Sequence, residues 1–113
     1  MSEQENQPLS GIEKMVLKEQ VTEQIRTVYD PEIPVNIYEL GMVYDVVVGD
    51  DRTVEITMTL TSPSCPAAQI IPAEVRDKAE LVEGVRAANV HVVWEPRWDP
   101  SMMSEEARLT LGM

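Results

Sequence analysis

Apolar residues recur at helical spacing near the start of the chain and again after its midpoint. The first group lies on one face of a predicted helix and consists of Leu17, Val21, Ile25 and Val28. The second group lies on one stripe and consists of Ile71, Val75, Ala79 and Val82. The sequence therefore predicts two amphipathic helices, each with one face in the core.

Residues next to these groups predict where the helices begin and end. SGIE at 10–13 fits a capping box, in which Ser10 caps the first helix and Glu13 reaches back to it. Pro31 disfavours helix at Asp30, so the first helix must end before it. Gly84 fits the C′ position after the second helix, and Pro72 removes a backbone donor within it.

Strand patterns lie between and after the two helices. MVYDVVV (42–48) and TVEITMTL (53–60) flank GDDR (49–52), which predicts a β-hairpin. In the second strand Val54, Ile56, Met58 and Leu60 alternate with Thr53, Glu55, Thr57 and Thr59, so one face of the sheet meets the core. ANVHVVWE (88–95) predicts a third strand, with Val90, Val92 and Trp94 on one face.

The last segment, 98–113, is typical of a short helix capped by Asp99 or Ser104 and closed by Gly112. The element order α-β-β-α-β-α predicts an α+β fold, a single small domain with a three-stranded sheet packed on helices. Polar residues 1–9 are expected to form a disordered N-terminal tail, and 10–113 the domain. The pattern leaves open whether the third strand pairs with the first or the second.

The charge narrows the classes of partner. The formal net charge is −11, from 20 acidic and 9 basic residues among 113. Such an acidic protein repels phosphate backbones and anionic membranes, which disfavours nucleic acid and lipid as partners. The start MSEQENQP lacks the features of a signal peptide, and one cysteine cannot form an internal disulfide. These observations favour a cytoplasmic location.

The single cysteine, Cys65, follows a strand and precedes a helix in TSPSCPAA (61–68). Pro66 suits the first position of that helix. Backbone N–H groups at a helix N-terminus favour a thiolate, which is the reactive and metal-binding form of cysteine. The alternative is a small buried apolar residue, which is what most free cysteines are. The residues alone leave both readings open.

Three motifs resemble one family. YDPEIPVNIYELGMVYDV, VEITMTLTSPSCPAAQIIPAEV and VVWEPRWDPSMMSEEARLTLGM, in this order, are similar to the SufT-like metal–sulfur cluster assembly factors. This family also includes PaaD-like proteins and the eukaryotic cytosolic iron–sulfur targeting factor. The resemblance covers residues from about 12 to 113, and the ending without a further cysteine-bearing tail matches the SufT-like branch.

The resemblance implies an auxiliary factor in iron–sulfur cluster assembly that assists cluster transfer to, or maturation of, client apoproteins through Cys65. It implies that Cys65 is a cluster or iron ligand and that Asp30, Pro31 and Glu32 match the acidic loop of the family. From the residues themselves, Asp30, Glu32 and Glu39 are candidates to position a metal or a basic groove of a client, although Asp-Pro also initiates turns by itself. Clusters usually take about four thiolates, so one cysteine per chain predicts a transient cluster that a monomer does not hold stably. A homodimer, in which two Cys65 thiolates meet at one symmetry axis, is an alternative that the sequence does not decide.

Two other functions compete with this hypothesis. One is an interaction module that recruits clients without binding a cluster. The other is an enzyme with Cys65 as nucleophile, which needs a nearby base. His91, the only histidine, is expected on the strand face opposite Val90, where a solvated or packed role suffices. We therefore expect no enzymatic activity. Trp94 and Trp98 are expected to hold the tail against the sheet.

Overall fold

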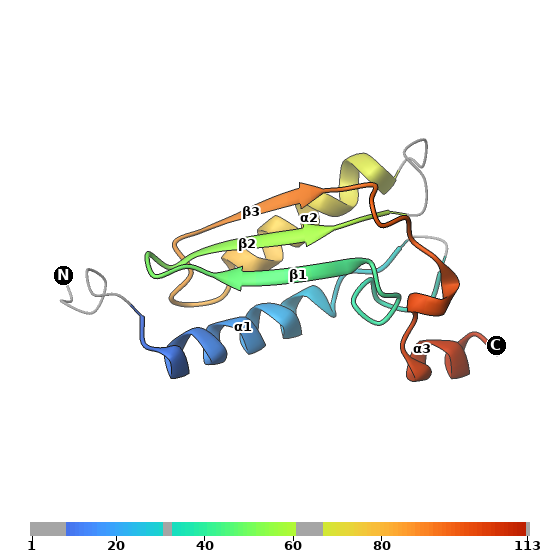
Figure 1. Cartoon of the computed structure of the whole chain (residues 1–113), viewed down its shortest axis with the longest axis horizontal. Coiled ribbons are helices and arrows are strands. Elements are labelled where there is room, and N and C mark those ends of the chain that lie inside the picture. The colour runs from blue at the N-terminus through green and yellow to red at the C-terminus, as the bar shows by residue number, and fades with distance from the viewer. Residues whose placement is uncertain (1–8, 31–32, 61–66, 113) are drawn as a thin grey trace.

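A computed structural model describes residues 9–30, 33–60 and 67–112, with the backbone alone for 67–69. The elements follow the predicted order α-β-β-α-β-α, with one short 3₁₀-helix added before the last helix (Figure 1). They are α1 (Gly11–Ile25), β1 (Val43–Val48), β2 (Thr53–Met58), α2 (Ala67–Glu80), β3 (Ala87–Val92), η2 (Pro100–Met102) and α3 (Glu105–Thr110). The predicted α+β fold with a three-stranded sheet is confirmed.

The sheet has the order β1-β2-β3, which answers the question that the sequence left open. β1 and β2 pair antiparallel through the predicted hairpin, with Val46 opposite Ile56. β3 pairs parallel with β2, with Val90 opposite Ile56. A parallel connection needs a crossover, and α2 supplies it between β2 and β3. β2 is therefore central, and β1 and β3 are the two edge strands.

Both long helices contribute buried side chains to one core. Val21 and Ile25 of α1 and Ile71 and Val75 of α2 are at most 1% exposed. The core face of β2 contributes Val54, Ile56 and Met58, which are fully buried. The apolar stripes and the strand alternation predicted from the sequence are thus confirmed, and they explain why the helices lie against the sheet.

The caps of the helices fix where they begin. Ser10 and Glu13 form the predicted capping box, in which the Ser10 backbone N–H donates to Glu13 Oε1 at 3.0 Å and the Glu13 N–H donates to Ser10 Oγ at 3.1 Å. These bonds, chiefly those to Ser10, lower the pKa of the Glu13 carboxyl. Asp99 and Ser104 were predicted as alternative caps of one helix. Each is the N-cap of a different helix, Asp99 of η2 and Ser104 of α3.

The structure departs from the predictions at several positions. Val28 and Val82, placed on the two helices, are buried but lie beyond the ends of α1 and α2, and Trp94, placed on the third strand, lies beyond the end of β3. α2 ends at Glu80, so Gly84, with φ +97°, lies in the turn beyond the helix and not at its C′ position. Thr59, expected on the outer face of the sheet, is fully buried just past the end of β2. Leu9, placed in the N-terminal tail, is 6% exposed and joins the core, while residues 1–8 lie outside the described chain.

The other face of the sheet carries polar groups. His91 lies there, as predicted, with its Nε2 2.6 Å from Glu55 Oε1, and Asn89 Nδ2 donates to Glu55 Oε2 at 2.7 Å. These hydrogen bonds, first that from Asn89 and then that from His91, lower the pKa of the Glu55 carboxyl. His91 is 55% exposed, which fits a solvated strand histidine. No helix among the described residues is long and apolar enough to cross a membrane.

Candidate functional site

The loop between α1 and β1 folds back on itself at one end of the sheet. Tyr29 and Asn36 form an isolated antiparallel bridge, and the Ile37 N–H donates to the Val28 carbonyl at 2.9 Å. Val35, Ile37 and Leu40 are buried, so the described segment 33–42 packs against the core. The predicted site residues Asp30 and Glu39 both belong to this segment.

The C-terminal segment holds this loop from the other side. Trp98 Nε1 donates to the Leu40 carbonyl at 2.8 Å, and the Ser104 N–H donates to the Glu39 carbonyl at 2.8 Å. Gly41 has φ +81°, and a Cβ atom added there would lie 2.3 Å from the Met102 carbonyl oxygen. The close approach of the two segments at Gly41 therefore requires glycine. The predicted role of Trp98 agrees with its hydrogen bond, whereas Trp94 is 40% exposed.

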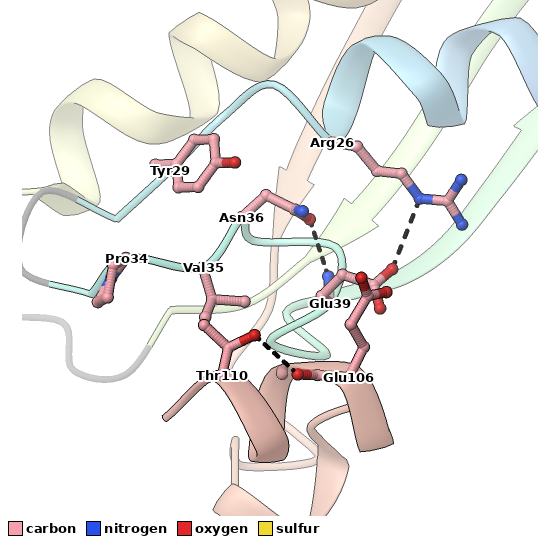
Figure 2. Close-up of a pocket in the computed structure, with 9 residues that line it drawn as sticks. Arg26, Tyr29, Pro34, Val35, Asn36, Glu39, Glu106 and Thr110 are labelled. Carbon is pink, nitrogen blue, oxygen red and sulfur yellow. Dashed lines mark hydrogen bonds and ion pairs between the residues drawn. The ribbon is translucent and has the colours of Figure 1, made fainter. Parts of the chain in front are cut away.

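Glu39 is held in place by both its backbone and its carboxylate. Its N–H donates to Asn36 Oδ1 at 2.9 Å, and its Oε2 lies 3.5 Å from Arg26 Nε (Figure 2). The Glu39 side chain is 17% exposed, which makes this ion pair partly shielded from water. The Arg26 guanidinium also pairs with Glu23 at 2.5 Å and lies 4.8 Å from the centroid of the Tyr38 ring. One arginine thus balances two carboxylates.

A cavity of about 480 Å³ opens between the end of α1, the 29–39 loop and α3 (Figure 2). Its lining is Arg26, Tyr29, Pro34, Val35, Asn36, Glu39, Glu106, Ala107 and Thr110. Two carboxylates, Glu39 and Glu106, and one guanidinium, Arg26, are its charged groups. Such a lining suits a polar or basic segment of a partner better than an apolar small molecule.

Asp30 is 7% exposed, and its carbonyl accepts from the Ile33 N–H at 3.2 Å. The buried position makes Asp30 part of the fold of the loop. Glu32, the neighbouring acidic residue of the DPE motif, lies outside the described residues. The structure therefore tests only part of the predicted acidic cluster.

Cys65 also lies outside the described residues, but its flanks are described. Leu60 is buried at the end of β2, where the Thr59 N–H donates to the Met42 carbonyl at 2.8 Å. The described part of α2 begins at Ala67, two positions after Cys65. The end of β2, the start of α2 and the loop segment 33–42 lie at the same end of the molecule (Figure 1). Cys65 thus comes between a strand end and a helix start, as the sequence predicts.

Sequence reasoning missed Arg26, Asn36 and Glu106. Asn36 and Arg26 hold Glu39 and line the cavity with it, and Glu106 reaches the cavity from the first turn of α3. No local pattern joins α3 to a loop more than 60 positions earlier. Within the described parts of the chain, no group of three or more histidine, cysteine, aspartate or glutamate side chains is arranged to hold a metal ion.

Comparison with known proteins identifies the family of this chain. Residues 18–92 match the family model of iron–sulfur cluster assembly proteins. An Fe-S protein maturation auxiliary factor of Porphyromonas gingivalis is 54% identical over 84% of this chain and 90% of its own length. The Fe-S protein maturation auxiliary factor SufT of Staphylococcus aureus is 37% identical over 76% of this chain and 98% of its own length.

A solved structure supports the same assignment. A domain of unknown function from Bacillus anthracis is 34% identical, with a TM-score of 0.85 over 92% of this chain and 99% of that chain. The fold and the sequence therefore agree, and the resemblance to SufT-like factors is confirmed. The chain belongs to the iron–sulfur cluster assembly protein family.

Proposed function

We propose that this protein is an auxiliary factor in iron–sulfur cluster assembly that assists cluster transfer to, or maturation of, client apoproteins. The observation that carries the proposal is the 54% identity to a maturation auxiliary factor over nearly the whole length of both chains. The partners would be the assembly machinery and its client apoproteins. The role is not enzymatic, because an auxiliary factor acts by binding and handing over a cargo.

Cys65 is the proposed working group. Its place two positions before the described start of α2 supports a thiolate favoured by helix N–H groups. A cluster usually takes about four protein ligands, whereas this chain has one cysteine. The cluster is therefore a transient cargo, with the remaining ligands supplied by a client, by small thiols or by a second copy. Incomplete ligation lets the cargo leave readily.

Glu39 is proposed as a support of this site. Its carboxylate is fixed at the cavity by Arg26 and Asn36, at the same end of the molecule as the residues that flank Cys65. Asp30, which is 7% exposed, is proposed to support the site by shaping the loop from inside, and Glu32 by adding acidic charge next to it. An acidic surface around a cavity of this size attracts basic segments of a partner and speeds encounter.

The test replaces Cys65 in cells that lack the parent protein. Cys65→Ser and Cys65→Ala should stay folded, with melting temperatures close to that of the parent, because both side chains are of similar size. Both should fail to restore the activity of an iron–sulfur client enzyme, because neither supplies a thiolate. Full restoration by both variants would show that Cys65 is only packing.

Anaerobic iron and sulfide analysis distinguishes a protein that carries a cluster from a module that recruits clients without binding one. A protein that carries a cluster should gain iron and sulfide on reconstitution and lose them to an added apoprotein client. The Cys65→Ala variant, treated in the same way, should gain neither. If parent and variant both stay free of iron while Cys65 is still required in cells, the thiol contacts the client and the protein is a recruiting module.

A further inference from the structure

The two edges of the sheet are protected differently against pairing with another strand. β1 has an exposed charge, Asp45, and a bulge between Val43 and Asp45, and both features disfavour a new partner strand. β3 has the sequence AANVHV, with no charged residue and no proline, and it pairs with β2 in unbroken register. Apart from Glu80 of α2, which accepts from the Ala88 N–H, this edge has no such protection and is a template for strand addition.

The outer side of β3 carries the backbone groups that do not pair with β2. The Ala88 N–H donates to Glu80 Oε2 at 3.1 Å, whereas the Val93 N–H donates to the Met58 carbonyl of β2 at 2.8 Å. Because successive N–H groups of a strand point to opposite sides, those of Val90 and Val92 point away from β2, as that of Ala88 does. No strand of the described chain pairs with this side of β3.

We propose that the outer edge of β3 pairs antiparallel with the same edge of a second copy, about a twofold axis beside Val90. The outward groups at 88, 90 and 92 are symmetric about Val90, so the edge is complementary to itself. Val90 of each copy exchanges two hydrogen bonds with Val90 of the other. The Val92 N–H of each copy faces the Ala88 carbonyl of the other, and a six-stranded sheet results.

The charge distribution favours a second copy at this edge. The chain carries −11 overall, yet β3 contains no acidic residue, and Asn89 and His91 already hold the Glu55 carboxylate of β2. A groove of about 480 Å³ runs beside the edge, and its one charged residue is Arg76. The carboxylate at the edge itself is that of Glu80, which accepts from the Ala88 N–H. In a pair centred on Val90 the two Glu80 carboxylates lie at opposite ends of the paired segment, so the local repulsion between them is small. The remaining repulsion between two acidic copies is long-range, so salt should screen it and strengthen the dimer.

This dimer does not rest on the function proposed for Cys65. In an antiparallel arrangement the carboxyl end of β3 in one copy lies beside the amino end of β3 in the other. The end of β2 and the start of α2, which precede and follow Cys65 in the chain, lie near the carboxyl end of β3 (Figure 1). The two copies would therefore carry their cysteine segments at opposite ends of the joined sheet, and each would receive or deliver its cargo separately.

Sedimentation equilibrium over a wide range of protein concentration tests the proposal. The parent should dimerise reversibly, more strongly at high than at low sodium chloride. Val90→Pro removes one outward N–H per copy, so two hydrogen bonds are lost, and the dissociation constant should rise about 30-fold. The matched control is Val46→Pro, which removes an outward N–H from the protected edge of β1 and should leave dimerisation unchanged.

A disulfide trap gives a second readout that does not depend on proline. Asn89 of one copy would lie opposite His91 of the other in a non-hydrogen-bonded pair, which is within disulfide range. Asn89→Cys with His91→Cys, in a Cys65→Ser background, should give a covalent dimer on mild oxidation. Asp45→Cys with Val47→Cys in the same background should not. A parent that sediments as a monomer at every concentration and salt, or equal trapping in both pairs, would overturn the proposal.

Discussion

The two ends of the sheet are built in different ways. At the hairpin end, residues 49–53 close on themselves, since the Gly49 N–H donates to the Thr53 carbonyl at 2.8 Å and the Thr53 N–H donates to Asp51 Oδ1 at 3.1 Å. At the loop end, residues 28–42 are held by the segment 96–110. The hydrogen bonds of this segment join distant parts of the chain. Trp98 and Leu40 are 58 positions apart, and Pro96 and Tyr44, at the start of β1, are 52 positions apart.

This difference shows how the candidate site depends on the rest of the molecule. A change in the hairpin turn affects residues within a few positions of it. A change in the tail reaches Glu39, because the Ser104 N–H holds the Glu39 carbonyl and Trp98 holds that of Leu40. We therefore expect the loop end to respond to substitutions in either of two distant segments.

The largest effect is expected at Gly41. Gly41→Ala places a Cβ atom at φ +81° and 2.3 Å from the Met102 carbonyl oxygen, so the tail must move away. Backbone strain and overpacking together should lower the free energy of unfolding by about 3 kcal/mol. Gly112→Ala is the control, because Gly112 has φ +75° but open space around it, and it should cost about 1 kcal/mol. Urea unfolding followed by circular dichroism measures both, and equal losses would show that the contact with Met102 is unimportant.

The fold could be predicted from the sequence where partners lie close together in the chain. The capping box at Ser10 and Glu13 and the hairpin turn at 49–52 each depend on at most a few neighbouring residues. The core faces were predictable because periodicity alone fixes which side chains point inward. The end of α2 was missed because Gly84 can adopt φ +97° in a turn as readily as at a helix terminus.

The candidate site could be predicted only in part. Cys65 was a candidate from its position between a strand and a helix, and the motifs of the family added the acidic loop, but neither source predicts side-chain contacts. The ion pair of Glu39 with Arg26 and the contact of α3 with the loop depend on tertiary packing between distant segments. Side-chain periodicity contains no information on such pairs. The pairing of β3 with β2 was undecidable for the same reason.

The next largest effect is expected at Trp98. Trp98→Phe keeps most of the apolar ring but removes the N–H that donates to the Leu40 carbonyl. The loss of this bond should lower the free energy of unfolding by about 1–2 kcal/mol. Trp94→Phe is the control, since Trp94 is 40% exposed, and a change within about 0.5 kcal/mol is expected there. Should the two variants melt alike, the tail is held by something other than this bond.

A smaller effect, measured on activity, is expected at Glu39. Glu39→Gln keeps the shape of the side chain but removes its charge from the cavity. Client maturation should fall several-fold, because a basic client segment meets less opposite charge. Glu83→Gln is the control at the hairpin end, where an exposed carboxylate is removed far from the loop. The rate of client activation with each variant decides the matter, and equal rates would remove Glu39 from the site.

The smallest effect is expected in the stability of the protein at acidic pH. Asp51 at the hairpin end accepts the Thr53 N–H, and Asp99 at the loop end accepts the Ser101 N–H at 2.8 Å. Chiefly through these bonds, the pKa of each carboxyl is lowered from its ordinary value of 3.8. A carboxyl with a lowered folded pKa stabilises the protein fully above its unfolded pKa, and this contribution is lost as the pH falls through the folded value.

Asp51→Asn and Asp99→Asn should therefore each make the melting temperature fall less steeply between pH 5 and pH 2 than it does in the parent. Both side chains are exposed, so the change in slope should be small. Because the two residues lie at opposite ends of the sheet and share no partner, the double variant should show the sum of the two changes. Calorimetry at several pH values gives these slopes. Slopes equal to that of the parent would mean that neither carboxylate contributes to acid stability, and a double variant far from the sum would mean that the two ends are coupled through the sheet.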